Sequence, residues 1–205
     1  MRVCLPAILF CFYAYFMALG VVLGIETAGP TETVKSAADQ AILILRDPLI
    51  PEETKSELIS SLIRNYFDFI DISKRVLGTY RHQYESRLEE FVPLFTELVE
   101  KMYLSQIKQA VREGINIEYR GERKEKDFTE VYTYISDINK ESYSIEYRLR
   151  LVKGRWRIYD IQVEGISLVN NYRSQFQHLL SRYSFDEVLE KLKAKVVEIR
   201  KHLKK

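Results

Sequence analysis

Residues 156–176 read WRIYDIQVEGISLVNNYRSQF and pass from a strand pattern to a helix pattern. At the start of this stretch apolar side chains alternate with polar ones, which is the period of a half-buried strand. The alternation then changes phase, because Trp156 and Ile158 stand at even positions whereas Ile161 and Val163 stand at odd positions. A β-bulge near Tyr159-Asp160 would return both pairs to one face of a sheet.

The second half of the stretch predicts a helix. Gly165 is expected to end the strand, and Ser167 is expected to cap the helix by accepting a hydrogen bond from an amide of its first turn. The apolar positions of this helix and of a final one recur at helical spacing: Leu168, Val169, Tyr172, Phe176 and Leu179, then Phe185, Val188, Leu189, Leu192 and Val196. The pattern predicts C-terminal helices over residues 167–203.

Upstream of Trp156, the strand period extends over three earlier segments. The alternating sets are Ile115, Ile117 and Tyr119, then Tyr132 and Tyr134, then Tyr143, Ile145, Tyr147, Leu149 and Leu151. Three connections suit hairpins: a charged loop from Gly121 to Asp127, a tight Asn139-Lys140 turn and a two-residue Lys153-Gly154 turn. Residues 114–165 are therefore predicted to form an antiparallel meander of four strands.

Residues 34–112 are predicted to be helical. Apolar residues recur at helical spacing over 34–45 and 51–63, and a third helix is expected between an Asp68 cap and Gly78. A long helix follows, in which Pro93 predicts either a kink or a start near Glu89, because an interior proline removes a backbone hydrogen bond. Helices, meander and helices together indicate an α+β fold in which helices cover one face of the sheet.

The N-terminus has the features of an export signal. Residues 3–25 carry no charge, Arg2 precedes them, and small residues suitable for cleavage occur at 18–20 and 22–24. We expect residues 1–24 to be a signal peptide and residues 25–205 a single domain, with an uncleaved inner-membrane anchor as the alternative. Cys4 and Cys11 both lie in this segment, so cleavage would leave a chain without disulfides.

Charge and residue types exclude several function classes. The formal net charge is +2, from 31 basic and 29 acidic residues, which argues against nucleic-acid binding through a basic face. His82, His178 and His202 show no metal-ligand spacing, and the sequence has no nucleophile elbow, Walker loop or dinucleotide-binding glycine motif. We expect no metal, no cofactor and no enzymatic activity. Asp160, at the phase change, is more simply explained as a bulge residue bonded to backbone amides than as a catalytic acid.

Residues 156–176 also resemble the signature of the MlaC (toluene-tolerance) family of periplasmic phospholipid-binding proteins. Phe67-Asp68-Phe69 and Val76-Leu77-Gly78-Thr79-Tyr80 resemble the family too, whereas Tyr80-Arg81-His82 and Pro93 depart from its pattern. The resemblance implies an NTF2-like curved sheet with a helical subdomain, and an apolar cavity for phospholipid acyl chains. It also implies two partners: an outer-membrane lipoprotein complex and an inner-membrane ABC transporter complex with a lipid-binding ring.

An acyl chain needs a deep apolar site, because each buried methylene contributes about 0.8 kcal/mol. The residues expected to line it are Val76, Phe95, Leu98, Met102, Tyr132, Tyr134, Tyr143, Ile145, Tyr147 and Leu149. Simple core packing of the same residues is the alternative for each. Three other functions remain open: an NTF2-like enzyme with a buried Asp, a structural adaptor without lipid, and a carrier of another lipid such as a hopanoid.

Overall fold

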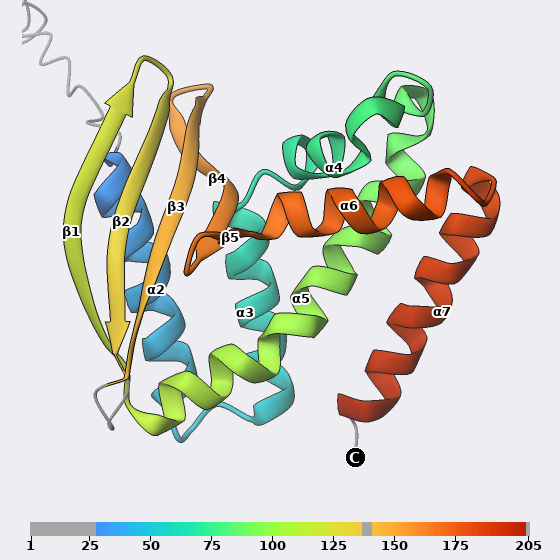
Figure 1. The fold of residues 1–205 in the computed structure, drawn as a ribbon. Helices are drawn as coiled ribbons and strands as arrows, with labels where there is room; N and C mark the ends of the chain where they lie inside the picture. The colour runs from blue at the N-terminus through green and yellow to red at the C-terminus, as the bar shows by residue number, and fades with distance from the viewer. Residues whose placement is uncertain (1–27, 137–140, 204–205) are drawn as a thin grey trace, which may run out of the picture.

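The computed structural model describes residues 28–136 and 141–203 and has an α+β fold, as predicted (Figure 1). The expected signal peptide (1–24) and the predicted Asn139-Lys140 turn lie outside these residues. In chain order the elements are α2 (Pro30–Arg46), α3 (Glu52–Tyr66), α4 (Phe69–Leu77), the 3-10 turns η1 (Gly78–Arg81) and η2 (Glu85–Arg87), α5 (Leu88–Glu113), β1 (Asn116–Glu125), β2 (Phe128–Ser136), β3 (Ser142–Val152), β4 (Arg155–Val163), β5 (Ile166–Ser167), α6 (Leu168–Leu180) and α7 (Phe185–Leu203).

The strands form one antiparallel sheet in the order β1-β2-β3-β4-β5. The predicted meander of four strands is therefore correct, but a short fifth strand, β5, follows it. The predicted Lys153-Gly154 turn joins β3 to β4, with φ angles of 48° and 77°. Both residues have the left-handed conformation that tight two-residue hairpins need. Glu164 and Gly165 have φ angles of 49° and 77° and turn the chain from β4 into β5.

The predicted loop from Gly121 to Asp127 is wrong. β1 continues to Glu125, with an irregularity of register between Tyr119 and Gly121, and only Lys126 and Asp127 form the turn. The side chains of residues 121–125 are exposed on both sides of the strand. Their sequence therefore has no apolar alternation, which is the signal that a strand prediction needs.

The change of phase in β4 is a bulge, as predicted. Arg148 of β3 pairs with Asp160 and Leu149 pairs with Ile158, so Tyr159 is the additional residue. Trp156 and Ile158 before the bulge, together with half-buried Ile161 after it, all pack in one cluster next to the sheet.

The predicted helix signals are also correct. The Asp68 carboxylate accepts a hydrogen bond from the Asp71 amide at 3.0 Å at the start of α4, and Gly78, with φ +56°, stands directly after its end. The long helix α5 begins at Leu88, next to the predicted Glu89, and Pro93 lies inside it.

Two apolar clusters hold the fold together. The helical cluster joins α4, α5, α6 and α7, and its aromatic rings pack edge-to-face, with centroids 5.1 Å apart for Phe91 and Phe176 and 5.2 Å for Phe95 and Tyr172. The sheet cluster lies between the sheet and α2, and its fully buried members are Val34, Val131, Leu149, Trp156 and Ile158. Figure 1 shows α2 along one face of the sheet, with α6 and α7 away from that face.

Candidate functional site

The face of the sheet that packs on α2 has an apolar surface built by strand register. Tyr147 pairs with Val131 and Ile145 pairs with Thr133, so these side chains lie on one face of β2 and β3. Leu149 has the same parity and belongs to the sheet cluster with Val34 of α2. The four residues predicted from β3, which are Tyr143, Ile145, Tyr147 and Leu149, therefore all face α2, as expected for alternating positions of one strand.

The exposure of the side chains on this face changes from one end of the sheet to the other. Leu149 is fully buried near the β1–β2 turn. At the opposite end, where β3 begins and β4 ends, Tyr143 is 45% exposed and Val163 is 43% exposed. Ile145 and Tyr147, between these ends, are half-buried. Exposure of the α2-facing side chains thus increases from the Leu149 end of the sheet to the Tyr143 end.

Helix α2 lies against this face of the sheet (Figure 1). Its apolar residues recur at helical spacing and form a stripe along the helix, which begins at Val34 in the sheet cluster: Val34, Ala38, Ala41, Ile42 and Leu45. Val34 is buried, whereas the remaining four are only half-buried. We call the region between this stripe and the α2-facing side of the sheet the cleft, with its closed end at Leu149 and its open end at Tyr143 and Val163.

Burial shifts the ionisation of two tyrosines on this face of the sheet. Burial raises the pKa of Tyr147 to about 12. Burial also raises the pKa of Tyr119 to about 12, with smaller contributions from Tyr147 and from the negative charges of Asp39 and Glu32 on α2. Both phenols are therefore harder to ionise than a tyrosine in water.

The prediction that Tyr132 and Tyr134 share the inward face is wrong. Tyr132 pairs with Glu146 and Tyr134 with Ser144, on the face turned away from α2. The inward positions of β2 are instead Thr129, Val131 and Thr133, all buried. The two threonines look polar in the sequence, although their β-branched side chains suit a buried strand. The alternation of β-branched residues at 129, 131 and 133 is the sequence signal for this face.

The predicted residues from the helices lie elsewhere. Val76, Phe95 and Leu98 are buried in the helical cluster, where they pack against other helices. Met102 of α5 is exposed. The structure therefore brings together the β3 residues of the predicted site but separates them from the helical ones.

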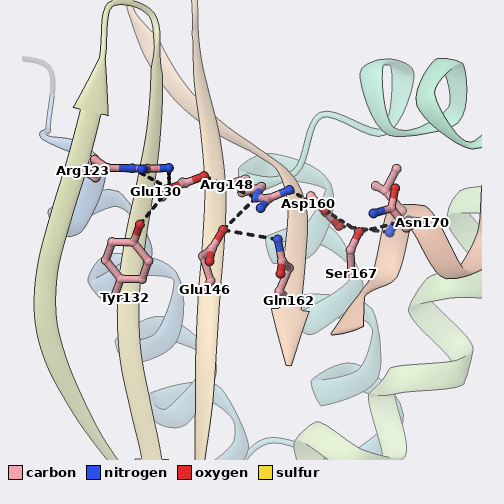
Figure 2. A network of polar contacts seen from close by, with 10 residues as sticks. Arg123, Glu130, Tyr132, Glu146, Arg148, Asp160, Gln162, Ser167 and Asn170 are labelled. Carbon is pink, nitrogen blue, oxygen red and sulfur yellow. Dashed lines mark hydrogen bonds and ion pairs between the residues drawn. The ribbon is translucent and has the colours of Figure 1, made fainter. Parts of the chain in front are cut away.

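A network of polar side chains crosses the outward face of the sheet (Figure 2). Arg123 and Tyr132 donate hydrogen bonds to Glu130 at 2.6 and 2.7 Å, and Arg148 donates to Glu146 at 2.7 Å. Burial raises the pKa of the Glu130 carboxyl, but the bonds from Tyr132 and Arg123 outweigh this effect and hold the pKa below its usual value. The charges on this face are paired with one another.

Asp160 ends this network, and it has the structural role that the sequence favoured. Its carboxylate is 5% exposed and accepts hydrogen bonds from the Ser167 hydroxyl at 2.6 Å and the Val169 amide at 3.0 Å. Ser167 in turn caps α6 by accepting a bond from the Asn170 amide. A carboxylate at the N-terminus of a helix is stabilised by the free amides there. Asp160 thus fastens the sheet to α6.

Among the residues that the structure describes, no group of three or more His, Cys, Asp or Glu side chains is arranged to hold a metal ion. His82 and His178 are both exposed. Over the same residues no helix is long and apolar enough to cross a membrane. The partly exposed apolar side chains of the cleft make it the candidate site.

Comparison with known proteins identifies the family. The model of the MlaC protein family matches residues 35–194. The chain is also 21% identical over 176 residues to the intermembrane phospholipid transport system binding protein MlaC of Haemophilus influenzae, which covers 82% of each chain. A solved phospholipid-binding protein from Ralstonia solanacearum, in complex with a phospholipid, has the same fold, with a TM-score of 0.73, 20% identity, and coverage of 84% of this chain and 99% of that one. The family model covers well over half of the sequence, and the chain therefore belongs to the MlaC family.

Proposed function

We propose that this protein is a non-enzymatic periplasmic carrier that binds phospholipid acyl chains in the cleft. The observation that carries the proposal is the uneven covering of the α2-facing side of the sheet. A sheet face built only for stability would be covered along its whole length, as it is around Leu149. Here apolar side chains at one end, including Tyr143 and Val163, are left partly exposed.

The dimensions of the cleft suit an acyl chain. Val34 and Leu45 mark the ends of the α2 stripe, and at 1.5 Å per residue this stripe is about 16 Å long. The hydrocarbon core of a bilayer is about 30 Å thick, so the acyl chains of one leaflet extend over roughly 15 Å. The stripe is therefore as long as the chain that it would cover.

The proposed lining is narrower than the set expected from the sequence. It keeps Tyr143, Ile145 and Tyr147 of β3, which face α2. To these we add Ile135 of β2, which pairs with Tyr143, and Val163 of β4, which pairs with Ile145. Leu149 forms the closed end.

Family membership supports a place between two membranes. The Haemophilus relative is named as the binding protein of an intermembrane phospholipid transport system. We propose that this chain is exported by residues 1–24 and exchanges lipid with an outer-membrane lipoprotein complex and with an inner-membrane ABC transporter complex that has a lipid-binding ring. The intact mass of the exported protein tests the first step, since a mass that includes Met1 would favour the uncleaved anchor.

The decisive experiment is identification of lipid that copurifies with the full chain after expression in a Gram-negative host. Native mass spectrometry of the unsubstituted protein should show bound phospholipid. Ile145→Trp should reduce its occupancy by filling the cleft, whereas Tyr134→Trp, on the opposite face, should leave it unchanged. Absence of lipid would favour the adaptor function, and a polycyclic lipid would identify a different cargo. Equal occupancy in Ile145→Trp would refute the cleft as the site.

A further inference from the structure

A positively charged pocket lies at the open end of the cleft. It has a volume of about 350 Å³ and lies where the C-terminal ends of α2 and α5 meet the N-terminal end of α3. Its charged residues are Arg46, Glu52, Lys55, Lys108 and Arg112. Four cations and one carboxylate give the pocket a formal charge of +3, on a chain whose total is only +2.

The two lysines are held in fixed positions within the pocket. The Glu52 carboxylate accepts from the Lys55 ammonium at 3.0 Å and from the Lys108 ammonium at 2.9 Å. The side chains of Lys55 and Lys108 are only 10% and 19% exposed, whereas that of Glu52 is 67% exposed. The ammonium groups are therefore the fixed part of the pocket, and the carboxylate, which extends into solvent, is the part that can move aside.

The two arginines have no counter-ion among the described residues. Neither Arg46 nor Arg112 makes a hydrogen bond or ion pair with another residue that the structure describes. A guanidinium group has a planar set of donors that matches two oxygens of a phosphate. With two free guanidinium groups beside two ordered ammonium groups, the pocket is suited to a phosphate group.

The pocket adjoins the cleft on its apolar side. Leu45, the last residue of the α2 stripe, lines the pocket together with buried Val111. Gly114, which also lines the pocket, lies two residues before β1 begins at Asn116. At this end of the sheet Asn116 of β1 pairs with Ser136 of β2, which in turn pairs with Ser142 of β3. A molecule with a charged head in the pocket could thus extend its apolar part directly along α2.

We propose that this pocket binds the phosphate group of the phospholipid whose acyl chains occupy the cleft. The inference rests on the proposed function. It assigns a direction to the lipid: the headgroup lies at the Arg46 and Arg112 end, and the chain ends lie toward Leu149.

Isothermal titration of the delipidated full chain tests the assignment with three probes. The probes are dihexanoyl phosphatidylglycerol, dihexanoylglycerol, which lacks the phosphate, and inorganic phosphate. In the variant Arg46→Gln/Arg112→Gln, affinity for the phospholipid should fall by at least about tenfold, because charge-assisted hydrogen bonds are lost. Affinity for dihexanoylglycerol should change by less than about twofold, because its binding is apolar.

The matched control is Arg155→Gln/Arg182→Gln. These two arginines are also exposed and lack side-chain partners among the described residues, but they lie outside the pocket. This control should bind all three probes like the unsubstituted protein. A similar loss in the control would overturn the assignment, because the effect would then be one of total charge. Thermal melting should show both double variants to be as stable as the unsubstituted protein, since neither loses a bond.

The remaining outcomes separate this inference from the proposed function. If phospholipid binds equally well without Arg46 and Arg112, the headgroup assignment is wrong while the cleft remains the site. If the arginine variant loses binding of inorganic phosphate but keeps binding of phospholipid, the pocket binds a free anion and the headgroup assignment is again overturned. If neither dihexanoyl probe binds the unsubstituted protein, the proposed function itself fails.

Discussion

Replacement of Asp160 by Ala should destabilise the protein strongly, because this buried carboxylate bonds two groups at the start of α6. It accepts hydrogen bonds from the Ser167 hydroxyl at 2.6 Å and from the Val169 amide at 3.0 Å. Arg148 Nη1 lies 3.8 Å away. The substitution would leave a hydroxyl and an amide buried without their acceptor.

The magnitude follows from these contacts. A hydrogen bond to a charged group contributes about 1.5–3 kcal/mol, and a negative charge near a helix N-terminus adds about 0.3–1 kcal/mol. The cost of burying the carboxylate offsets part of this sum. Because of this cost, we expect Asp160→Ala to lower the free energy of unfolding by about 3 kcal/mol, which is the lower end of what two hydrogen bonds to a charged group contribute. Asp160→Asn keeps an acceptor oxygen and should lose about half as much.

Urea unfolding followed by far-UV circular dichroism measures the effect. At about 2–4 °C per kcal/mol for a chain of this length, the melting temperature of Asp160→Ala should fall by roughly 6–12 °C. Asp39→Ala is the matched control, because Asp39 is exposed on α2 and has no hydrogen bond to a described residue. It should change the free energy of unfolding by less than about 0.5 kcal/mol. An equally small change in Asp160→Ala would refute the structural role, and loss of lipid transfer at unchanged stability would favour a functional one.

Three further predictions concern stability. Leu149→Trp should lower the free energy of unfolding of the lipid-free protein by about 1–3 kcal/mol in urea titrations, because the site is filled; unchanged stability would place empty space there instead. Burial raises the pKa of Tyr147 in the folded protein to about 12, from an ordinary 10.0. The stability linked to this shift is fully present below pH 10 and is lost as the pH rises toward 12. Tyr147→Phe should therefore weaken the decline of the melting temperature between pH 10 and 12, and an identical decline would contradict the assignment. Gly78→Ala should cost about 1–2 kcal/mol, because φ is +56° and the added Cβ would lie 2.8 Å from Gln177 Nε2; a neutral melting temperature would show that the turn relaxes.

Local signals in the sequence predicted most of the element boundaries. The Asp68 cap, the positive φ of Gly78, the Ser167 cap and the Lys153-Gly154 turn each depend on side chains within a few residues of one another. Such signals act through short-range sterics and hydrogen bonding, so they are present in the sequence itself.

The arrangement of the candidate site could be predicted only in part. Alternation placed Tyr143 to Leu149 on one face of β3, but it could not say which face of β2 meets them, because that depends on the pairing register. Likewise, Phe95 of α5 and Leu149 of β3 both look like interior residues, yet they belong to different clusters. Membership in a cluster is a property of tertiary packing, for which periodicity carries no signal.

The separation of the two clusters also bears on how the molecule opens. Phe67 packs against both of them, and the chain around it is bonded to β4: the Asp68 amide donates to the Ile158 carbonyl at 2.8 Å, and Arg157 donates to the Phe67 carbonyl at 2.6 Å. Cooperative units built around separate apolar clusters open with different free energies, and amide hydrogen exchange reports each of them separately. Amides at the Tyr143 and Val163 end of the sheet should exchange long before those of α5 beside Phe91. The sheet can thus open locally while the aromatic helices keep their native packing.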